Sequence, residues 1–343
     1  MKNLRHYSLP QLEDLLLEWG EKKSRAKAIY SCLWEHYADT IAGMDSLPET
    51  LRQRLEATHY IPRVQNDHFQ YSDDGTIKSR MKLEEGHFIE GVLIPAEKRV
   101  TACLSSQVGC SLSCRFCATG YMERKRNIHF DEIVDQLVLL NQQSLLHYGK
   151  PVSNVVFMGM GEPLLNYRNV GMAIEKITMP KGLAIAPRRV TISTAGVAKM
   201  IRQLADDGLK VNLALSLHAA NDAKRNEIMP INETNNLDTL IDALNYFYER
   251  TRNEITFEYI LFRDFNDSLQ DADELVQIFR RVPAHLVNVL EYNPIDQANY
   301  QKPDEDIIRN FTNYLNAHKV NAHLRRSRGK DIDAACGQLA NVN

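Results

Sequence analysis

Three cysteines in the first half of the chain have a spacing that suits an iron–sulfur cluster. Cys110, Cys114 and Cys117 form the pattern C-x3-C-x2-C. Three thiolates can bind three irons of a [4Fe–4S] cluster and leave the fourth iron open. The amino and carboxylate groups of S-adenosylmethionine (SAM) are a natural chelate for that open iron, and an electron from the reduced cluster would then cleave the sulfonium. The spacing therefore predicts a [4Fe–4S] cluster that acts on SAM.

A structural zinc site is the alternative use of these three thiols. Zinc in a structural site takes four ligands, and His129 is the only nearby residue that could supply the fourth. No second pair of ligands follows that would complete a zinc finger. We therefore favour the iron–sulfur cluster.

Small and polar residues follow several of the predicted strands. The apolar run 154–158 leads directly into Gly159-Met160-Gly161-Glu162-Pro163. Glycine lets the backbone approach a ligand closely, and a carboxylate can accept hydrogen bonds from an ammonium group. Each such residue alone could merely cap a loop, but ligands of β/α barrels bind at the carboxyl ends of the strands. As a set, they predict SAM contacts from Gly161, Glu162, Ser193, Ser216, Leu217, His218 and Asn293.

Two further cysteines, Cys103 and Cys336, lie outside the cluster pattern. Both could be small apolar residues of the core. Cys336, however, is bracketed by Gly329 and Gly337 and has polar neighbours, and a thiol in a loop of small residues resembles a reactive position. The residues alone leave both interpretations open.

Three regions must position these side chains. Residues 1–60 have the pattern of a small helical bundle, which opens with a capping box formed by Ser8 and Gln11. Residues 61–101 change to a period near two and form a short, strand-rich connector. From residue 102 to 343, apolar runs alternate with helical segments, which predicts a parallel sheet, open or closed into a barrel. The expected strands are 154–158, 189–193, 211–215, 255–260, 287–290 and 320–324. Helical patterns fill the gaps between them, for example at 130–145, 198–207, 236–251 and 271–281.

The composition is that of a globular protein. Among 343 residues, 44% are hydrophobic and 25% charged, which excludes a disordered chain, a collagen-like repeat and a disulfide scaffold. The net charge of -3 argues mildly against a protein wrapped in nucleic acid but leaves room for a local basic face. We see no apolar stretch long enough to span a membrane and no secretory signal, so we expect a cytoplasmic protein with no membrane partner.

At this point the residues resemble the RlmN/Cfr family of radical-SAM adenine methyltransferases. The resemblance covers most of the chain and rests on the segments 103–117, 159–166, 188–194 and 331–339. It implies an α/β fold, namely a partial parallel (β/α) radical-SAM barrel with an N-terminal helical RNA-binding accessory domain. It also implies cluster ligands at Cys110, Cys114 and Cys117.

The resemblance assigns roles to both remaining cysteines. Carbon 2 of adenine has no lone pair and cannot attack SAM, whereas a thiolate can. Cys336 would therefore carry the methyl group, and Cys103 would release the product by forming a disulfide with Cys336. Glu90 matches the family's proton acceptor, although a glutamate on a strand could instead face solvent. Two SAM molecules would be used per turnover.

The implied substrates are 23S rRNA, at the peptidyl-transferase loop, and tRNA, at the adenine 3′ of the anticodon. An external electron donor such as a flavodoxin-type reductant is implied as a partner, and we expect a monomer. Two alternatives stay open: methylation of carbon 8, as by the Cfr relatives, and a non-catalytic RNA-binding protein with a structural metal site. Candidate phosphate contacts are Arg124-Lys125-Arg126, Arg188-Arg189, Arg280-Arg281, Arg325-Arg326, Arg328 and, in the helical region, Lys22-Lys23, Arg25 and Lys27.

Overall fold

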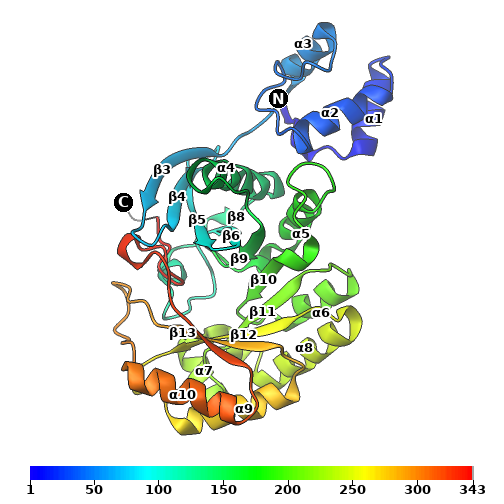
Figure 1. The fold of residues 1–343 in the computed structure, drawn as a ribbon. Coiled ribbons are helices and arrows are strands. Elements are labelled where there is room, and N and C mark those ends of the chain that lie inside the picture. Colours follow the sequence, from blue (N-terminus) through cyan, green and yellow to red (C-terminus); the bar gives the residue numbers. More distant parts are fainter. Residues whose placement is uncertain (342–343) are drawn as a thin grey trace.

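A single ten-stranded sheet runs through the centre of the molecule (Figure 1). The computed structural model describes residues 1–341. The strands of this sheet are β3 Gln65–Tyr71, β4 Ile77–Lys82, β5 Phe88–Ala96, β6 Arg99–Cys103, β9 Asn154–Phe157, β10 Val190–Thr194, β11 Asn212–Ser216, β12 Ile255–Leu261, β13 Leu286–Glu291 and β14 Ala322–Arg325. Their order is β14-β13-β12-β11-β10-β9-β6-β5-β4-β3.

The sheet is parallel over most of its width and is not closed. β6 pairs in parallel with β9, and each strand from β9 to β14 is parallel to its neighbour. β3, β4 and β5 extend the sheet as antiparallel strands. Within residues 1–341, β3 and β14 are its two edges. The predicted partial parallel barrel is therefore confirmed, and the strands of the predicted connector 61–101 are continuous with it.

Helices alternate with the parallel strands, as expected for β/α units. They are α4 Phe130–Tyr148, α5 Tyr167–Ile177, α6 Ala198–Asp206, α7 Asp222–Ile228, α8 Leu237–Thr251, α9 Leu269–Arg281 and α10 Glu305–Ala317. A short two-stranded sheet joins β7 Gln107–Val108 to β8 Arg126–Asn127. The sequence analysis missed α5, α7, α10 and β6. Among residues 1–341, no helix has both the length and the apolarity to cross a membrane.

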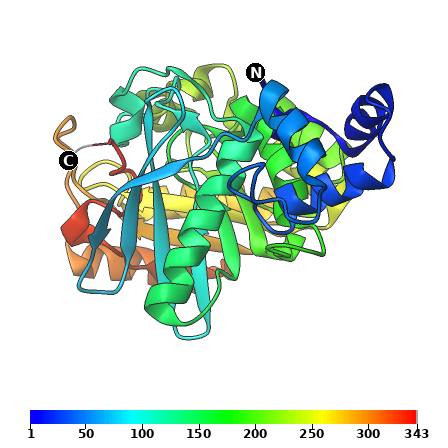
Figure 2. The same ribbon diagram turned by 90° about the horizontal axis from the view of Figure 1, so that it is seen from above.

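The N-terminal region is a bundle of three short helices that projects from the sheet (Figures 1 and 2). Its elements are α1 Leu9–Glu18, α2 Ser24–Trp34 and α3 Glu49–Thr58, with β1 Lys2–Asn3 parallel to β2 His59–Tyr60. The predicted capping box is present, because Ser8 and Gln11 exchange side-chain and backbone hydrogen bonds at the start of α1. The three helices lie within residues 1–60, where the sequence predicts a helical unit.

One helix, α4, connects this bundle to the sheet. Asp135 on α4 accepts from Arg5 Nη1 at 2.8 Å and from Arg63 Nη1 at 2.7 Å. The next residue, Gln136, bonds the backbone of Ser105 in both directions, at 3.0 and 3.1 Å. Arg5 also lies over the ring of Trp34, 4.7 Å from its centroid. Adjacent residues of one helix therefore bind the bundle and the loop after β6.

Replacing Asp135 with alanine is expected to destabilise the fold strongly. The substitution leaves Arg5 and Arg63 without their shared carboxylate in a buried setting, which costs about 3–5 kcal/mol. Denaturant unfolding monitored by circular dichroism measures the change. Asp306→Ala removes an exposed ion pair to Arg309 and should cost no more than about 1 kcal/mol. Equal, small losses in the two variants would contradict the structural role of Asp135.

Candidate functional site

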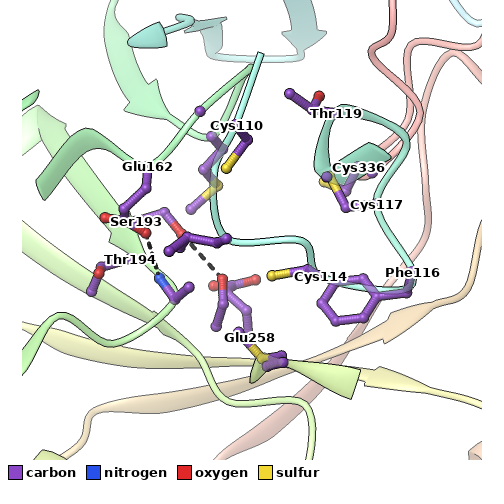
Figure 3. A pocket seen from close by; sticks show the side chains of 18 of the residues that line it. Cys110, Cys114, Phe116, Cys117, Thr119, Glu162, Ser193, Thr194, Glu258 and Cys336 are labelled. Carbon is purple, nitrogen blue, oxygen red and sulfur yellow. Dashed lines mark hydrogen bonds between the residues drawn. The ribbon is translucent and has the colours of Figure 1, made fainter. Parts of the chain in front are cut away.

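An open cavity lies where the parallel strands β9 to β13 end, the position predicted for a ligand (Figure 3). The empty space within it, counted to the open mouth, is about 890 Å³. Nine of the residues singled out in the sequence line it: Cys110, Cys114, Cys117, Gly161, Glu162, Ser193, Ser216, His218 and Cys336. Four do not: Leu217, Asn293, Cys103 and Glu90.

Cys110, Cys114 and Cys117 come from one loop and occupy different parts of the cavity wall (Figure 3). Burial raises the pKa of all three thiols, that of Cys110 to about 11. Among residues 1–341, no group of three or more His, Cys, Asp or Glu side chains is arranged to hold a single metal ion. A [4Fe–4S] cluster needs a different arrangement, because each thiolate binds its own iron. Three soft sulfur donors around one cavity fit that group.

The turn after β9 brings the backbone against this loop. Gly161 has φ +93°, and a Cβ at this position would lie 2.4 Å from Cβ of Gln107. Only glycine fits such a close approach. The Gln107 side chain in turn accepts a hydrogen bond from the backbone N–H of Glu162 at 2.9 Å. The turn therefore fixes the position of the Glu162 backbone.

Glu162 is buried, and its two carboxylate oxygens hold two turns together. One oxygen accepts from Leu164 N at 2.9 Å, and the other from Ala195 N, after β10, at 2.8 Å. Burial raises the pKa of Glu162 to about 7. A cationic group in the cavity would favour the ionised carboxylate, which suits the ammonium of an amino-acid moiety.

Polar groups from the next strands continue this wall. The hydroxyl oxygens of Ser193 and Ser216 lie 3.5 Å apart. His218 Nδ1 accepts from Ile260 N at 3.1 Å, and burial lowers the pKa of the imidazole to about 3. The ring is therefore neutral at pH 7 and meets Phe116 edge to face. These groups offer hydrogen bonds without charge.

Leu217 and Asn293 support the wall from behind. Leu217 is fully buried, and its N–H donates to the Glu258 carbonyl at 3.0 Å. Asn293 Nδ2 donates to the backbone carbonyl of Cys336 at 3.2 Å. Asn293 therefore contacts the loop that carries Cys336, and Leu217 lies in the core.

Cys336 is exposed on a loop that is fastened to the three-cysteine loop. Ala118 N donates to the carbonyl of Gly337 at 2.7 Å, and the Thr119 hydroxyl donates to the carbonyl of Leu339 at 2.6 Å. Cys336 consequently lies beside Cys117 (Figure 3). The protein atoms around its sulfur raise the pKa of the Cys336 thiol, while the Arg325 guanidinium lowers it.

Cys103 and Glu90 lie on neighbouring strands outside the cavity. Cys103 ends β6 and is a buried free thiol, and its pKa is raised to about 12, first by burial and then by the charge of Cys336. Cys103 pairs across β5 with Val92, two residues from Glu90. Glu90 is only 1% exposed, so the alternative that it faces solvent is wrong.

Two buried charged residues of the site were missed in the sequence analysis. Arg225 donates to the carbonyls of Ala195, Ser216 and Leu217, at 2.6, 3.1 and 3.0 Å, and so joins the ends of β10 and β11. Glu258 lines the cavity and accepts from Asn288 Nδ2 at 2.7 Å. Its signal was a lone carboxylate within an otherwise apolar strand. Arg225 offered none, because one basic residue on a short helix is ordinary.

An Arg225→Met variant is expected to have a free energy of unfolding lower by about 3–5 kcal/mol, because several buried carbonyls lose their donor. It should also bind SAM weakly. Denaturant unfolding and calorimetric titration with SAM measure the two effects. Arg280→Met, at an exposed position of α9, is the matched control. A variant with unchanged stability and SAM affinity would contradict this role for Arg225.

Comparison with known proteins places these features in context. The model of the radical SAM superfamily matches residues 104–276. The model of the ribosomal RNA large subunit methyltransferase N-terminal domain matches residues 2–61. The first match covers the three-cysteine loop and most of the parallel sheet. The second covers the helical bundle.

Full-length relatives resemble the whole chain. A probable dual-specificity RNA methyltransferase RlmN of Cytophaga hutchinsonii is 50% identical, with 99% of this chain and 93% of the relative covered. A dual-specificity RNA methyltransferase RlmN of Campylobacter curvus is 39% identical over 99% and 93% of the two chains. A crystal structure of a radical SAM methyltransferase from Sphaerobacter thermophilus superposes with a TM-score of 0.92 at 36% identity, covering 99% of both chains.

Proposed function

The chain belongs to the RlmN family of radical-SAM RNA methyltransferases, and from this premise we propose that it methylates carbon 2 of an adenine in 23S rRNA and in tRNA. The observation that carries the proposal is the position of Cys336. This free thiol lines the same cavity as the three-cysteine loop and lies beside Cys117 (Figure 3). A nucleophilic sulfur is what methylation of an electron-poor ring carbon requires.

Cys110, Cys114 and Cys117 would hold the [4Fe–4S] cluster, and the wall formed by Gly161, Glu162, Ser193, Ser216 and His218 would bind SAM. The bound cluster supplies the electron that cleaves SAM to a 5′-deoxyadenosyl radical. Glu162 orients the ammonium group of SAM, and the neutral His218 supports the wall without repelling the sulfonium. Leu217 and Asn293 act through the residues that they hold in place.

Three residues would then act in order. The Cys336 thiolate attacks the methyl carbon of SAM, and S-adenosylhomocysteine leaves with the electron pair of the broken S–C bond. The S-methyl group loses a hydrogen atom to the 5′-deoxyadenosyl radical, and the methylene radical so formed adds to the ring carbon of the RNA. Glu90 accepts the proton that this ring carbon loses, and the one surplus electron of the adduct would return to the oxidised cluster. The Cys103 thiolate attacks the Cys336 sulfur, an S–S bond forms, and the S–C bond to the RNA breaks with its electron pair left on the methylene carbon, which takes up a proton and becomes the methyl group. External reductant returns both thiols to the free form.

A second cavity on the other side of Cys336 suits the RNA. Among its lining residues are Arg99, Arg325, Arg326 and Arg328, together with Cys336 itself. Three of these arginines were among the predicted phosphate contacts. Arg326 also binds Glu291 and Glu305, so part of this charge is balanced within the protein. An arginine-lined cavity next to the methyl-carrying thiol favours an approach of the sugar–phosphate backbone from this side.

The relatives distinguish between the alternatives. Their shared RlmN name, over almost the whole length of the chain, favours carbon 2 over the carbon 8 of the Cfr type. A non-catalytic RNA-binding protein would leave Cys103 and Cys336 without a role. We further propose a cytoplasmic monomer that receives electrons from a flavodoxin-type donor.

The test is anaerobic reconstitution followed by reaction with SAM, a reductant and unmodified 23S rRNA or tRNA. Nucleoside mass spectrometry against both isomer standards identifies the product. We expect 2-methyladenosine and 5′-deoxyadenosine. Formation of 8-methyladenosine alone would replace the assigned carbon, and a chain that binds RNA but never cleaves SAM would support the non-catalytic alternative.

Methylation of Cys336 is expected to become faster as the pH rises above neutrality. Because the pKa of this thiol is raised, little thiolate is present at pH 7. The thiolate is the nucleophile, so the rate should rise about tenfold per pH unit while the pH stays below the pKa. Intact-protein mass after brief incubation with SAM at several pH values measures the methyl transfer. A rate that does not change with pH would contradict this prediction.

A further inference from the structure

Glu90 lies in a third cavity that is separate from the cofactor cavity. This cavity is lined by Lys78, Glu90, Asp333, Gln338 and Ala340, and also by Ala118, Pro294, Ile295, Asp296 and Gln297. The loop that carries Cys336 thus separates the two cavities, since Cys336 faces one of them and Gln338 the other. A carboxylate that accepts a proton from RNA bound to Cys336 must therefore be held in register with this loop.

Lys78 is placed to do this. It is only 5% exposed, although a lysine is rarely buried without a specific partner. Its Nζ lies 3.6 Å from Oε1 of Glu90 and donates to the backbone carbonyl of Asp333 at 3.4 Å. Asp333 lies three residues before Cys336 on the same loop. One ammonium group therefore contacts both the carboxylate and the loop with the reactive thiol.

Among the described residues, Lys78 is the cation within reach of the Glu90 carboxylate. Another basic residue, Arg80, is the cross-strand partner of Glu90 in the register of β4 and β5. Its guanidinium, however, donates to Asp67 at 2.6 Å and lies over the ring of Phe88. Lys78 reaches Glu90 diagonally, as residues two positions apart on neighbouring strands can do.

The second carboxylate oxygen of Glu90 is held by the end of the described chain. Oε2 accepts from the backbone N–H groups of Ala340 at 2.9 Å and Asn341 at 3.2 Å. Oε1 thus contacts Lys78, which binds the Cys336 loop, and Oε2 contacts the residues that follow this loop. Oε1, which faces Lys78, has no backbone donor among the described residues.

We propose that Lys78 is a positioning residue for the release step: it holds the Glu90 carboxylate in register with the Cys336 loop so that Oε1 can take the proton from the ring carbon of RNA attached to Cys336. The C–H bond breaks, its electron pair stays with the ring, the one surplus electron of the adduct would return to the oxidised iron–sulfur cluster, and Glu90 becomes a neutral carboxylic acid. This inference rests on the proposed function. Lys78 plays no part in the earlier methyl transfer to Cys336.

The test compares Lys78→Met with the wild-type holoenzyme in two assays. Intact mass reports the S-methyl group on Cys336, and a denaturing gel reports RNA covalently bound to the protein. We expect near wild-type methylation of Cys336, accumulation of the RNA adduct and release of product that is slower by about tenfold or more. Lys78→Arg, which keeps the charge, should restore part of the release rate. Lys82→Met, at an exposed position of the same strand, should behave as the wild type.

Two outcomes would overturn the inference: release at the wild-type rate without adduct, or a loss of Cys336 methylation, which would make Lys78 a structural residue. If Lys78→Met does not fold, the same readouts on Lys78→Gln, which removes the charge but keeps a polar side chain, and on Lys78→Arg decide. Glu90→Gln should accumulate the same adduct. Failure of the proposed function is distinguishable, because no variant, including Cys103→Ala, would then form an adduct.

Discussion

A Cys336→Ala variant is expected to form no methylated RNA and no covalent RNA adduct, a loss of at least about a thousandfold. The cavity wall keeps its shape, because the bonds that fasten this loop use the backbone of Gly337 and Leu339 rather than the thiol. The variant should therefore still bind SAM and release 5′-deoxyadenosine. Nucleoside mass spectrometry and calorimetric SAM binding measure the two halves of this prediction.

Cys32→Ala is the matched control for the loss of a thiol. Cys32 is buried on α2, within the N-terminal bundle, and its sulfur contacts the hydroxyl of Ser46. The control should retain turnover. If Cys336→Ala still produced 2-methyladenosine, Cys336 would not carry the methyl group, and the methyl transfer would have to be direct.

A Cys103→Ala variant is expected to stop after attachment of the RNA and to accumulate the Cys336–RNA adduct. The charge of Cys336 contributes to the raised pKa of the Cys103 thiol, and no other group in the proposed sequence of steps can attack the Cys336 sulfur. Product release should fall by about a hundredfold or more, while methylation of Cys336 continues. A denaturing gel with labelled RNA shows the adduct, and nuclease treatment followed by peptide mass spectrometry locates it.

The effect of reductant is a second measure for the same variant. In the proposed mechanism, repeated turnover of the wild type requires external reductant to reopen a Cys103–Cys336 disulfide, whereas the first turnover needs only the two free thiols. Cys103→Ala should show no burst of product even in the presence of reductant. A variant that released product at the wild-type rate would assign the resolving role elsewhere.

Periodicity in the sequence predicted the parallel sheet well, and the elements that it missed have specific explanations. The six strands β9 to β14 are rich in apolar residues, and their positions were predicted to within two residues. β6 has five residues and follows a tight turn after β5, which hides its period. The α5 helix did carry a helical signal, with Val170, Ala173, Ile174 and Ile177 buried at i, i+3, i+4 and i+7. The sequence therefore contained the periodicity of this helix.

The parts of the candidate site whose residues lie close together in the sequence could be predicted. Cys110, Cys114 and Cys117 follow one another on a single loop, as do Gly161 and Glu162. Lys78, Arg225 and Glu258 could not be found in this way, because their partners lie on other elements, up to 255 residues away for Lys78 and Asp333. Burial of a charged group is a property of the folded chain.

The α4 helix links the N-terminal helical bundle to the loop that follows β6. Its adjacent residues Asp135 and Gln136 bind the helical bundle and the loop that follows Cys103, respectively. These contacts tie the position of the bundle to that of the loop after Cys103. An RNA that bound the bundle, as the proposed function implies, would then have to present its target adenine at the separation that this connection sets. Two RNAs with unrelated sequences can then serve as substrates, provided that their shapes present the same span.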